Sequence, residues 1–415
     1  MLDRKTKIAI IGQGYVGLPI TLLLSKSNYS VCAYDIDKKL IAKLKNGSYV
    51  ELNKNEDDVI DLYKSQIKKK KISFSSNLEA SDIYVICVPT PISRKNKPDL
   101  SFVYSAIKEV IKYIKDGDLI IIESTIALGS IKEIKKFIKS KKKLIKYQLA
   151  YCPERVLPGN SLKEVISNER IIGGIDKKSE QISKEFYQIF VKGKIHITSI
   201  EVAEVTKLAE NSFRDVNIAY ANELSMICSK NNVDPQKVIH FANKHPRVNI
   251  LTPGIGVGGH CIPIDPWFLI ENYKKKFSII KNARMVNKEK TRSVSKKIID
   301  IVELSIKNKK KRKNNIFLLG LSYKANIGDF RESPSIEIIN HLSKKLNKNI
   351  DIYINDPYLS NLEIKNTRTC SIKNGLKKSK IVVILVAHNQ YKNIKRYINS
   401  SHIILDECNI LEKKN

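Results

Sequence analysis

Short runs of apolar residues alternate with longer amphipathic segments along the first half of the chain. The opening stretch KIAIIGQGYVGLPITLLLSKSNYSVCAYDID predicts a strand, a glycine turn, a helix and a second strand that ends at Asp35. Further strands are predicted within 82–91, 118–125 and 147–154, and helical patterns such as FVYSAIKEVIKYI separate them. This alternation predicts a parallel, doubly wound sheet whose ligand binds beyond the carboxyl ends of the strands.

The pattern changes twice along the rest of the chain. A long helical pattern begins at about residue 196, and a second α/β pattern follows with strands in NNIFLLGLSY, DIYINDP and IVVILVAHN. There, Ser333 is the predicted N-cap of a helix that has Pro334 at its first position. We therefore predict an α/β protein with two Rossmann-like doubly wound domains joined by a long central helical region. The predicted boundaries are 1–195, 196–305 and 306–415.

The glycine turn carries a dinucleotide-binding pattern. Gly12, Gly14 and Gly17 form G-x-G-x-x-G directly after the first strand and at the start of a helix, and Asp35 follows about 20 positions later. Such glycines allow a tight turn, a close approach of backbone N–H groups to a pyrophosphate, and close packing of helix on strand. The Asp35 carboxylate favours NAD because it repels a 2′-phosphate, although the lysines at 38–39 leave NADP open. A tight turn that binds nothing is the alternative.

Composition changes this picture in two respects. The formal charge of +32 suggests a nucleic-acid partner, but the basic residues are mostly lysines spread over nearly every amphipathic segment, and no aromatic-basic motif of the nucleic-acid-binding modules is present. We therefore expect no nucleic-acid partner, whereas an anionic small substrate gains from the positive field. The seven cysteines lack C-x-x-C spacing, which favours reduced thiols.

The apolar stretches are not typical of a membrane protein. The basic start and the apolar residues after it resemble a signal peptide, but Gly12, Gly14 and Gly17 interrupt that stretch and no small-residue cleavage site follows. No other run approaches the roughly 20 apolar residues of a spanning helix. We expect a soluble, cytoplasmic protein without a membrane partner.

Two groups of polar residues are candidates for chemistry. Lys207, Asn211 and Arg214 share one face of the predicted long helix, and this face continues through apolar residues, so that we expect it to be partly buried rather than a solvated stripe. Isolated residues at strand ends are most often turn caps, but these ends are where a doubly wound sheet binds its ligand. The strand-end candidates are Thr90, Ser124, Thr125 and Glu154.

The stretch GVGGHCIPIDPW holds a lone cysteine, Cys261. A metal site needs more than the ligands that His245, His260 and Cys261 provide at their spacing, so we expect no metal. A buried structural cysteine is the common alternative, yet the glycine pair at 258–259 indicates a close approach of the backbone to a ligand. A nucleophile requires access and a nearby cation that lowers the pKa of the thiol, for which Lys207 and His260 are candidates.

A dinucleotide fold together with a reactive thiol points to a double oxidation. Oxidising a primary alcohol to an aldehyde transfers one hydride, and a thiolate that adds to the aldehyde makes a thiohemiacetal. Loss of a second hydride gives a thioester, which water releases as the acid. This scheme requires a nucleophile, a group that stabilises the oxyanion, and a carboxylate with positioned water. The residues that suit these roles are Cys261, Lys207 with Asn211, and Asp265 with Glu154 and Thr125.

Seven motifs in order along essentially the whole chain resemble the UDP-glucose/GDP-mannose dehydrogenase family. They are GQGYVGLP, CVPTP, ESTIALGS, YCPERVLPGN, EVTKLAENSFRDVNIAYANEL, GVGGHCIPIDPW and GLSYKANIGDFRESPS. The resemblance implies a two-step, NAD-dependent oxidation of a UDP-sugar at C6 for the synthesis of polysaccharide precursors. It also implies a homodimer formed through the central helix, or a higher homo-oligomer, with NAD bound by 1–195 and the UDP-sugar by 306–415.

The resemblance further implies a role for each residue that matches a family motif. Cys261 is implied as the nucleophile, Lys207 as the oxyanion-stabilising lysine, Asn211 as a substrate contact beside it, Asp265 as the carboxylate that orients water, and Glu154 as an acid/base. The implied cofactor contacts are Gly12, Gly14, Tyr15, Val16, Gly17, Asp35, Thr90, Thr125 and Arg331. The implied substrate contacts are Arg155, Val156, Lys207, Asn211, Arg214, His245, Arg247, Gly258, Tyr323 and Lys324.

Two departures from the UDP-glucose type concern the substrate. In PERVLPG, Pro158 stands where that type has a second glutamate and Arg155 adds a cation, which resembles the branch that oxidises UDP-N-acetylhexosamines. We expect UDP-N-acetyl-D-mannosamine first, its N-acetylglucosamine epimer next and UDP-glucose third. The second departure is at 406–408, where DEC stands in place of a common basic contact to uridine diphosphate. Either another lysine supplies that contact or nucleotide binding is weaker.

Two other classes of protein stay open. A β-hydroxyacid dehydrogenase shares the fold type and uses Lys207 and Asn211 for a single hydride transfer without a thiol. A basic binding protein without enzymatic activity is suggested only by the net charge.

Overall fold

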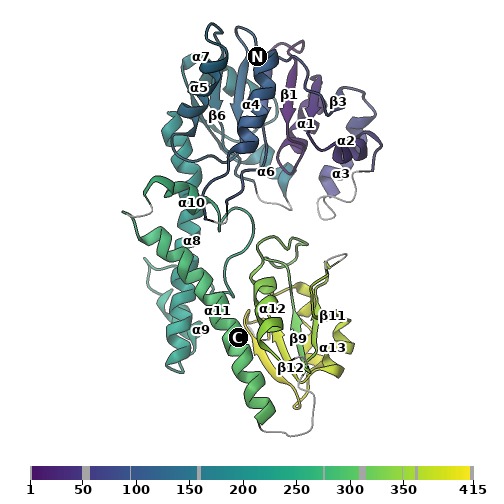
Figure 1. Cartoon of the computed structure of the whole chain (residues 1–415), viewed down its shortest axis with the longest axis vertical. Helices are drawn as coiled ribbons and strands as arrows, with labels where there is room; N and C mark the ends of the chain where they lie inside the picture. The colour runs from purple at the N-terminus through teal and green to yellow at the C-terminus, as the bar shows by residue number, and fades with distance from the viewer. Residues whose placement is uncertain are drawn as a thin grey trace. The chain divides into compact units, whose positions relative to one another are not determined.

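The computed structural model of the chain describes residues 2–48, 57–93, 95–156, 160–273, 276–307, 315–347, 349–359 and 363–411 (Figure 1). It divides into two units, Met1–Glu210 with Trp267–Glu271, and Asn211–Pro266 with Asn272–Asn415. Pro158, which the sequence analysis singled out, lies outside the described residues.

Eight of the described strands form the sheet of the first unit, in the order β3-β2-β1-β4-β5-β6-β7-β8. Their bounds are β1 Ile8–Ile11, β2 Val31–Tyr34, β3 Ile72–Ser75, β4 Ile83–Ile86, β5 Leu119–Ile122, β6 Gln148–Tyr151, β7 Arg170–Gly174 and β8 Ile195–Thr198. The predicted doubly wound sheet is confirmed, with one correction: β7 runs antiparallel to β6, whereas the other neighbours are parallel.

The sheet forms because its central strands are apolar on both faces, as expected for a sheet covered on both sides. Ile8 and Ile10 of β1 belong to a core with helices α1 and α7, while Ala9 and Ile11 belong to a core with α4 and α5. The helices of this unit are α1 Gly17–Lys26, α2 Lys38–Lys45, α3 Asp57–Ile67, α4 Ser101–Tyr113, α5 Ser130–Lys141, α6 Ser161–Ser167 and α7 Lys177–Gln188.

The predicted long helix is α8, Ile200–Lys230, and it begins after β8 rather than at residue 196. The next elements are α9 Pro235–Ala242, α10 Asp265–Leu269, the 3-10 helix η2 Glu271–Tyr273, and α11 Ile279–Lys307. None of the helices in the described ranges combines the length and the apolar character that crossing a membrane requires.

A five-stranded parallel sheet in the order β11-β10-β9-β12-β13 forms the core of the second unit. Its strands and helices are β9 Ile316–Leu319, α12 Pro334–Lys345, β10 Ile352–Asn355, β11 Thr367–Thr369, α13 Ile372–Lys378, β12 Ile381–Ile384, η3 Asn389–Tyr391, η4 Ile394–Tyr397 and β13 Ile403–Asp406. Ser333 is the N-cap residue of α12 as predicted, but its hydroxyl donates to the Leu321 carbonyl (2.6 Å) instead of capping the helix.

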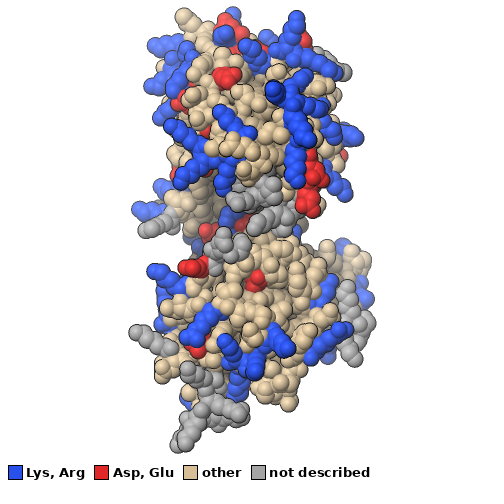
Figure 2. Space-filling view, turned by 90° about the vertical axis from the view of Figure 1, so that its right-hand side faces the viewer, with Lys and Arg blue, Asp and Glu red and all other residues tan. Residues whose placement is uncertain are grey.

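Lysine and arginine side chains are scattered over the face shown in Figure 2 and do not gather into one patch. This distribution agrees with the spread of lysines along the sequence. A sequence-independent nucleic-acid site requires clustered cations that follow a phosphate backbone. On this face the charge therefore supplies a diffuse positive field.

Helices α8 and α11 are joined by a buried polar network within the second unit. Arg284 and Asp215, both nearly inaccessible, form an ion pair (Nη1–Oδ1 2.5 Å). Asn287 donates to the same Asp215 oxygen (2.8 Å) and accepts from Asn222 (2.9 Å). Because removing one member leaves an uncompensated buried charge, this network is costly to interrupt.

We predict that Asp215→Ala lowers the free energy of unfolding by about 3–5 kcal/mol, because the Arg284 guanidinium is left buried without its counter-ion. Chemical denaturation monitored by circular dichroism measures the change. The matched control is Glu109→Ala, which breaks the exposed ion pair with Lys112 and should cost about 0–1 kcal/mol. Equal effects of the two substitutions would contradict the prediction.

Candidate active site

The glycine turn after β1 has the geometry of a dinucleotide-binding turn. The Gly17 Cα lies so close to the turn that an added Cβ would be 1.8 Å from the Gly12 carbonyl oxygen, whereas an added Cβ at Gly14 meets nothing within 4 Å. Buried Gln13 holds the turn by donating from Nε2 to the Ile10 carbonyl (2.9 Å). The turn is therefore closed on its protein side and open at Gly14, where backbone N–H groups at the start of α1 can donate hydrogen bonds to a pyrophosphate.

Asp35 follows β2 with its carboxylate fixed at both oxygens. Oδ2 accepts from the Gln13 N–H (2.8 Å) and Oδ1 accepts from the Asp37 N–H (2.9 Å). Asp37 in turn caps α2. Asp35 is thereby tied to the glycine turn, and these residues fit an adenosine ribose and a pyrophosphate in the arrangement predicted for NAD. Val16 is the N-cap residue of α1, and Tyr15 is 39% exposed.

Glu154, Thr90 and Thr125 follow strands of the same sheet, as predicted, and the threonines are half-buried. Glu154 is buried: Oε1 accepts from the Arg155 N–H (2.6 Å) and Oε2 from Arg170 Nη1 (3.0 Å). The sequence analysis did not predict a role for Arg170. Its local sequence shows only an arginine at the start of an apolar run.

The Arg155 side chain is directed to two partners in the first unit. Its guanidinium pairs with Glu210 (2.7 Å) and donates to the Glu169 carbonyl (3.1 Å). These three residues and Asn168 line a polar cavity of about 400 Å³. Val156 packs against the apolar core of the unit. The cavity is polar, and its cation, Arg155, is already paired with one of the two glutamates that line it.

The predicted stripe of α8 is partly buried. Lys207 and Asn211 are 7% and 8% exposed, whereas Arg214 is exposed. Asn211 Nδ2 donates to Oδ2 of buried Asp265 (2.7 Å), at the start of α10. Asn211 therefore ties the helix to the segment that follows the cysteine.

Cys261 lies half-buried, four residues before Asp265, and its carbonyl accepts from the Asp265 N–H (2.9 Å). The two glycines before Cys261 are required by close packing within the protein. Gly259 has a φ of +86° and an added Cβ would lie 2.9 Å from the Tyr323 ring, while at Gly258 an added Cβ would lie 2.6 Å from the Glu332 carbonyl. The close approach is thus to the loop after β9, and a sugar contact of Gly258 stays a prediction.

The loop after β9 carries Tyr323, Lys324 and Arg331. Tyr323 is half-buried and Lys324 is exposed. Arg331 makes hydrogen bonds to both carboxylate oxygens of Asp329. Burial acts to raise the pKa of Asp329, but the hydrogen bonds from Arg331 lower it below its usual value.

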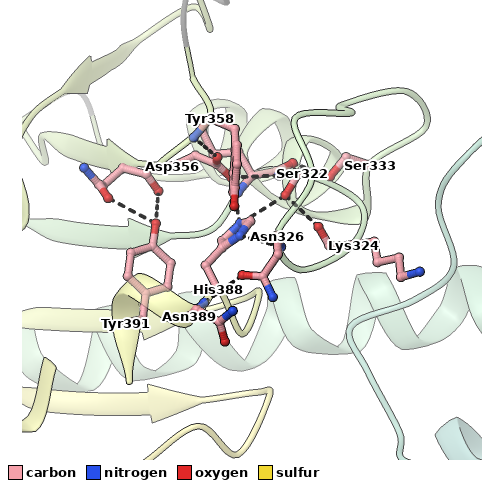
Figure 3. A network of polar contacts seen from close by, with 11 residues as sticks. Ser322, Lys324, Asn326, Ser333, Asp356, Tyr358, His388, Asn389 and Tyr391 are labelled. Atoms are coloured by element: carbon pink, nitrogen blue, oxygen red, sulfur yellow. Dashed lines mark hydrogen bonds and ion pairs between the residues drawn. The ribbon is translucent and has the colours of Figure 1, made fainter. Parts of the chain in front are cut away.

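A polar network holds this loop in place (Figure 3). His388 is fully buried and its Nδ1 accepts from the Asn326 N–H (2.9 Å), so the ring hydrogen is on Nε2. Nε2 faces Asp356 Oδ2 and Ser322 Oγ, each at 3.1 Å. Because Nε2 already carries a hydrogen, it cannot take the Ser322 proton, and the three residues are no nucleophilic triad. They fix the Tyr323–Lys324 segment instead.

The remaining candidates lie in the second unit. His245 and Arg247 are exposed, and His245 Nδ1 accepts from the Arg247 N–H (3.3 Å). Beyond β13, Glu407 pairs with Lys297 (2.9 Å). All seven cysteines lie in the described ranges and none is in a disulfide. Within those ranges no group of three or more His, Cys, Asp or Glu residues is arranged to hold a metal.

The two Rossmann-like sheets, the NAD-type turn and the thiol loop define a dinucleotide-dependent oxidoreductase with a second nucleotide-binding domain. Three family models match the chain: the UDP-glucose/GDP-mannose dehydrogenase NAD binding domain at 6–191, the central domain at 201–289 and the UDP binding domain at 317–413. The chain belongs to this family, and it is an NAD-dependent UDP-sugar dehydrogenase. The predicted family, fold class and cofactor are confirmed.

Relatives match over nearly the full length. A UDP-N-acetyl-D-mannosamine dehydrogenase of Methanococcus vannielii is 41% identical over 94% of this chain and 88% of its own. An NDP-N-acetyl-D-galactosaminuronic acid dehydrogenase of Ralstonia nicotianae is 34% identical over 98% and 96%. The solved structure of the UDP-D-ManNAc dehydrogenase of Pyrococcus horikoshii has 34% identity and a TM-score of 0.86, over 98% and 96%.

We predict that Asp35→Ser weakens NADH binding by about 10- to 100-fold, because hydrogen bonds to a charged group contribute about 1.5–3 kcal/mol. Removing the negative charge should weaken NADPH binding less or improve it. Fluorescence titration measures both affinities. The control is Asp37→Ser, which keeps a competent N-cap on α2 and should leave the NADH/NADPH preference unchanged. An unaltered preference in Asp35→Ser would contradict the assignment.

Proposed function

We propose that the protein oxidises the C6 hydroxyl of UDP-N-acetyl-D-mannosamine to the carboxylate, using two NAD and one water, through a thiohemiacetal and a thioester on Cys261. The observation that carries the proposal is the fixed cysteine loop, in which Asn211 holds Asp265 four residues beyond the thiol. A dehydrogenase that transfers a single hydride has no need of a nucleophile at this point.

The first half-reaction converts the alcohol to an aldehyde. A base removes the hydroxyl proton as the hydride leaves C6, and Lys207 or Glu154 supplies that base in the proposal. Bound NAD accepts the hydride of each oxidation. The Cys261 thiolate then adds to the aldehyde carbon, and Lys207 with Asn211 stabilises the oxyanion of the thiohemiacetal.

The second half-reaction releases the product. Loss of hydride from the thiohemiacetal carbon, with its hydroxyl proton passing to a base, gives the thioester. Asp265 orients a water that attacks the thioester carbon, and the Cys261 thiolate leaves. In total one alcohol, two NAD and one water give one acid, two NADH and two protons, before the acid ionises.

The sugar is inferred from the relatives and from the Arg155 site. The names of the relatives described above refer to N-acetylated sugar nucleotides. The cavity beside Arg155 is polar and includes the Asn168 amide, which suits hydrogen bonds to an acetamido group. UDP-N-acetylglucosamine and UDP-glucose are the alternative substrates, in that order.

We predict two NADH per sugar consumed and a kcat/KM for UDP-N-acetyl-D-mannosamine at least about 10-fold above that for UDP-N-acetylglucosamine or UDP-glucose, since one well-placed contact is worth about 1.4 kcal/mol. Absorbance at the NADH band and quantification of the sugar products measure both. One NADH per sugar, together with full activity of Cys261→Ala, would exclude the double oxidation and favour a β-hydroxyacid type of reaction.

We also propose that the enzyme is a homodimer formed through α8. Phe213, Tyr220 and Ile227 are 70%, 57% and 54% exposed, and their spacing of seven residues places them on one face of the helix. Large apolar side chains repeated along one face indicate a protein interface. A two-fold axis would bring the same face of a second copy against it.

We predict that Tyr220→Glu shifts the protein from dimer to monomer in light scattering coupled to size exclusion, because the new carboxylate would be buried without a partner. Tyr397 is 59% exposed outside this helix, so Tyr397→Glu is the matched control and should stay dimeric. A wild-type monomer, or two variants with the same mass, would refute this interface.

A further inference from the structure

A buried cluster of charged side chains lies behind Glu154, entirely within the first unit. Arg170 is 1% exposed, and its Nη1 is 3.0 Å from Glu154 Oε2 and 4.0 Å from Glu123 Oε1. Glu123 is equally buried and its Oε1 accepts from the Tyr187 hydroxyl (2.5 Å). The same nitrogen therefore faces two carboxyl groups, one at the proposed site and one behind it.

Arg170 has little freedom to turn elsewhere. Its guanidinium carbon lies 5.3 Å from the centroid of the Tyr187 ring, and among the described residues its Nε and Nη2 have no hydrogen-bond partner. Its contact with Glu154 and Glu123 therefore runs through Nη1. Two ionised carboxylates beside one guanidinium would leave a net negative charge in a site that water does not reach, which is costly.

Burial favours protonation of Glu123, the more deeply buried of the two carboxyl groups. Burial raises the pKa of Glu123 to about 7 even though Arg170 lowers it, and the negative charge of Glu154 contributes to the rise. Besides Arg170 and Glu154, the described titratable groups that face Glu123 are two thiols and a phenol, and these stay neutral near pH 7. Burial raises the pKa of Cys152 to about 12 and those of Cys87 and Tyr187 well above their usual values.

We propose that Glu123 is a positioning residue that controls, through Arg170, how firmly the Glu154 side chain is held in place. While Glu123 is protonated, Arg170 forms its ion pair with Glu154 alone, and the net charge of the three side chains is zero. When Glu123 ionises, the two carboxylates compete for Nη1, and Glu154 loses its fixed partner. The inference rests on the proposed function for the role of Glu154 in proton transfer.

The test is Glu123→Gln, which keeps the size and hydrogen-bonding capacity of the protonated side chain. We expect the ratio of wild-type to variant kcat, measured by NADH formation, to be constant below about pH 6 and to fall at least about threefold between pH 6 and 8.5, because only the wild type ionises there. KM for the sugar nucleotide should not follow this change. A ratio that is flat across this range overturns the proposal.

Tyr187→Phe gives a graded test of the same idea. The Tyr187 hydroxyl stabilises ionised Glu123, so its removal should move the inflection of kcat to higher pH. Glu204 is a matched control: it is a buried carboxylate of the same unit that accepts from the Gly129 and Ile131 N–H groups, and Glu204→Gln should leave the pH profile of the rate unchanged. An inflection that Tyr187→Phe does not move contradicts the role of Glu123.

A stability measurement separates this proposal from the proposed function. Because the pKa of Glu123 is raised in the folded state, its protonated form contributes stability that is present below about pH 4.5 and is lost as the pH rises through 7. The Tm of the wild type relative to Glu123→Gln should therefore fall between pH 5 and 8. If no UDP-sugar yields NADH but this fall occurs, only the proposed function fails. If the Tm difference is independent of pH, the titration of Glu123 is refuted.

Discussion

The hydrogen bond from Asn211 to Asp265 is the contact on which the thiol loop depends. It joins a long helix to the start of α10, and both side chains are buried. Two further contacts hold the same loop: the Gly254 N–H donates to Asn222 on α8 (2.9 Å), and the Gly259 N–H donates to the Arg331 carbonyl (3.1 Å). The position of Cys261 is therefore set by a helix and by the loop after β9, and not by the flexibility of its own glycine-rich segment. In the proposed reaction, a thiol held in this way loses little entropy when it attacks.

Two buried ion pairs among the described residues fix the orientation of the elements that carry them. The ion pair of Asp215 and Arg284 links α8 to α11, and that of Glu154 and Arg170 lies at the carboxyl ends of the first sheet. Such pairs seldom stabilise a fold as well as apolar residues would. Their presence here agrees with a need to fix orientation. The many exposed lysines act differently, because they provide a diffuse field that favours a diphosphate substrate.

Local patterns predicted much of the fold and the NAD cofactor. Runs such as LIII at β5 and the glycine turn before α1 are determined by neighbouring residues, so the sheet, the NAD turn and the long helix were accessible from sequence. Strand β7 was missed because it begins with Arg170 and ends with two glycines. The role of Arg170 depends on its contacts with Glu123 and Glu154, which lie on other segments of the chain. For the same reason no local signal showed that His388 orders the loop around Lys324.

The central claim, covalent catalysis by Cys261, is tested most directly by mass spectrometry of the enzyme acid-quenched during turnover with UDP-N-acetyl-D-mannosamine and NAD. The account predicts a substrate-derived mass on the peptide that contains Cys261, and no such mass on the same peptide when NAD is omitted. Formation of two NADH per sugar while this peptide stays unmodified, or an adduct on another residue, would contradict it.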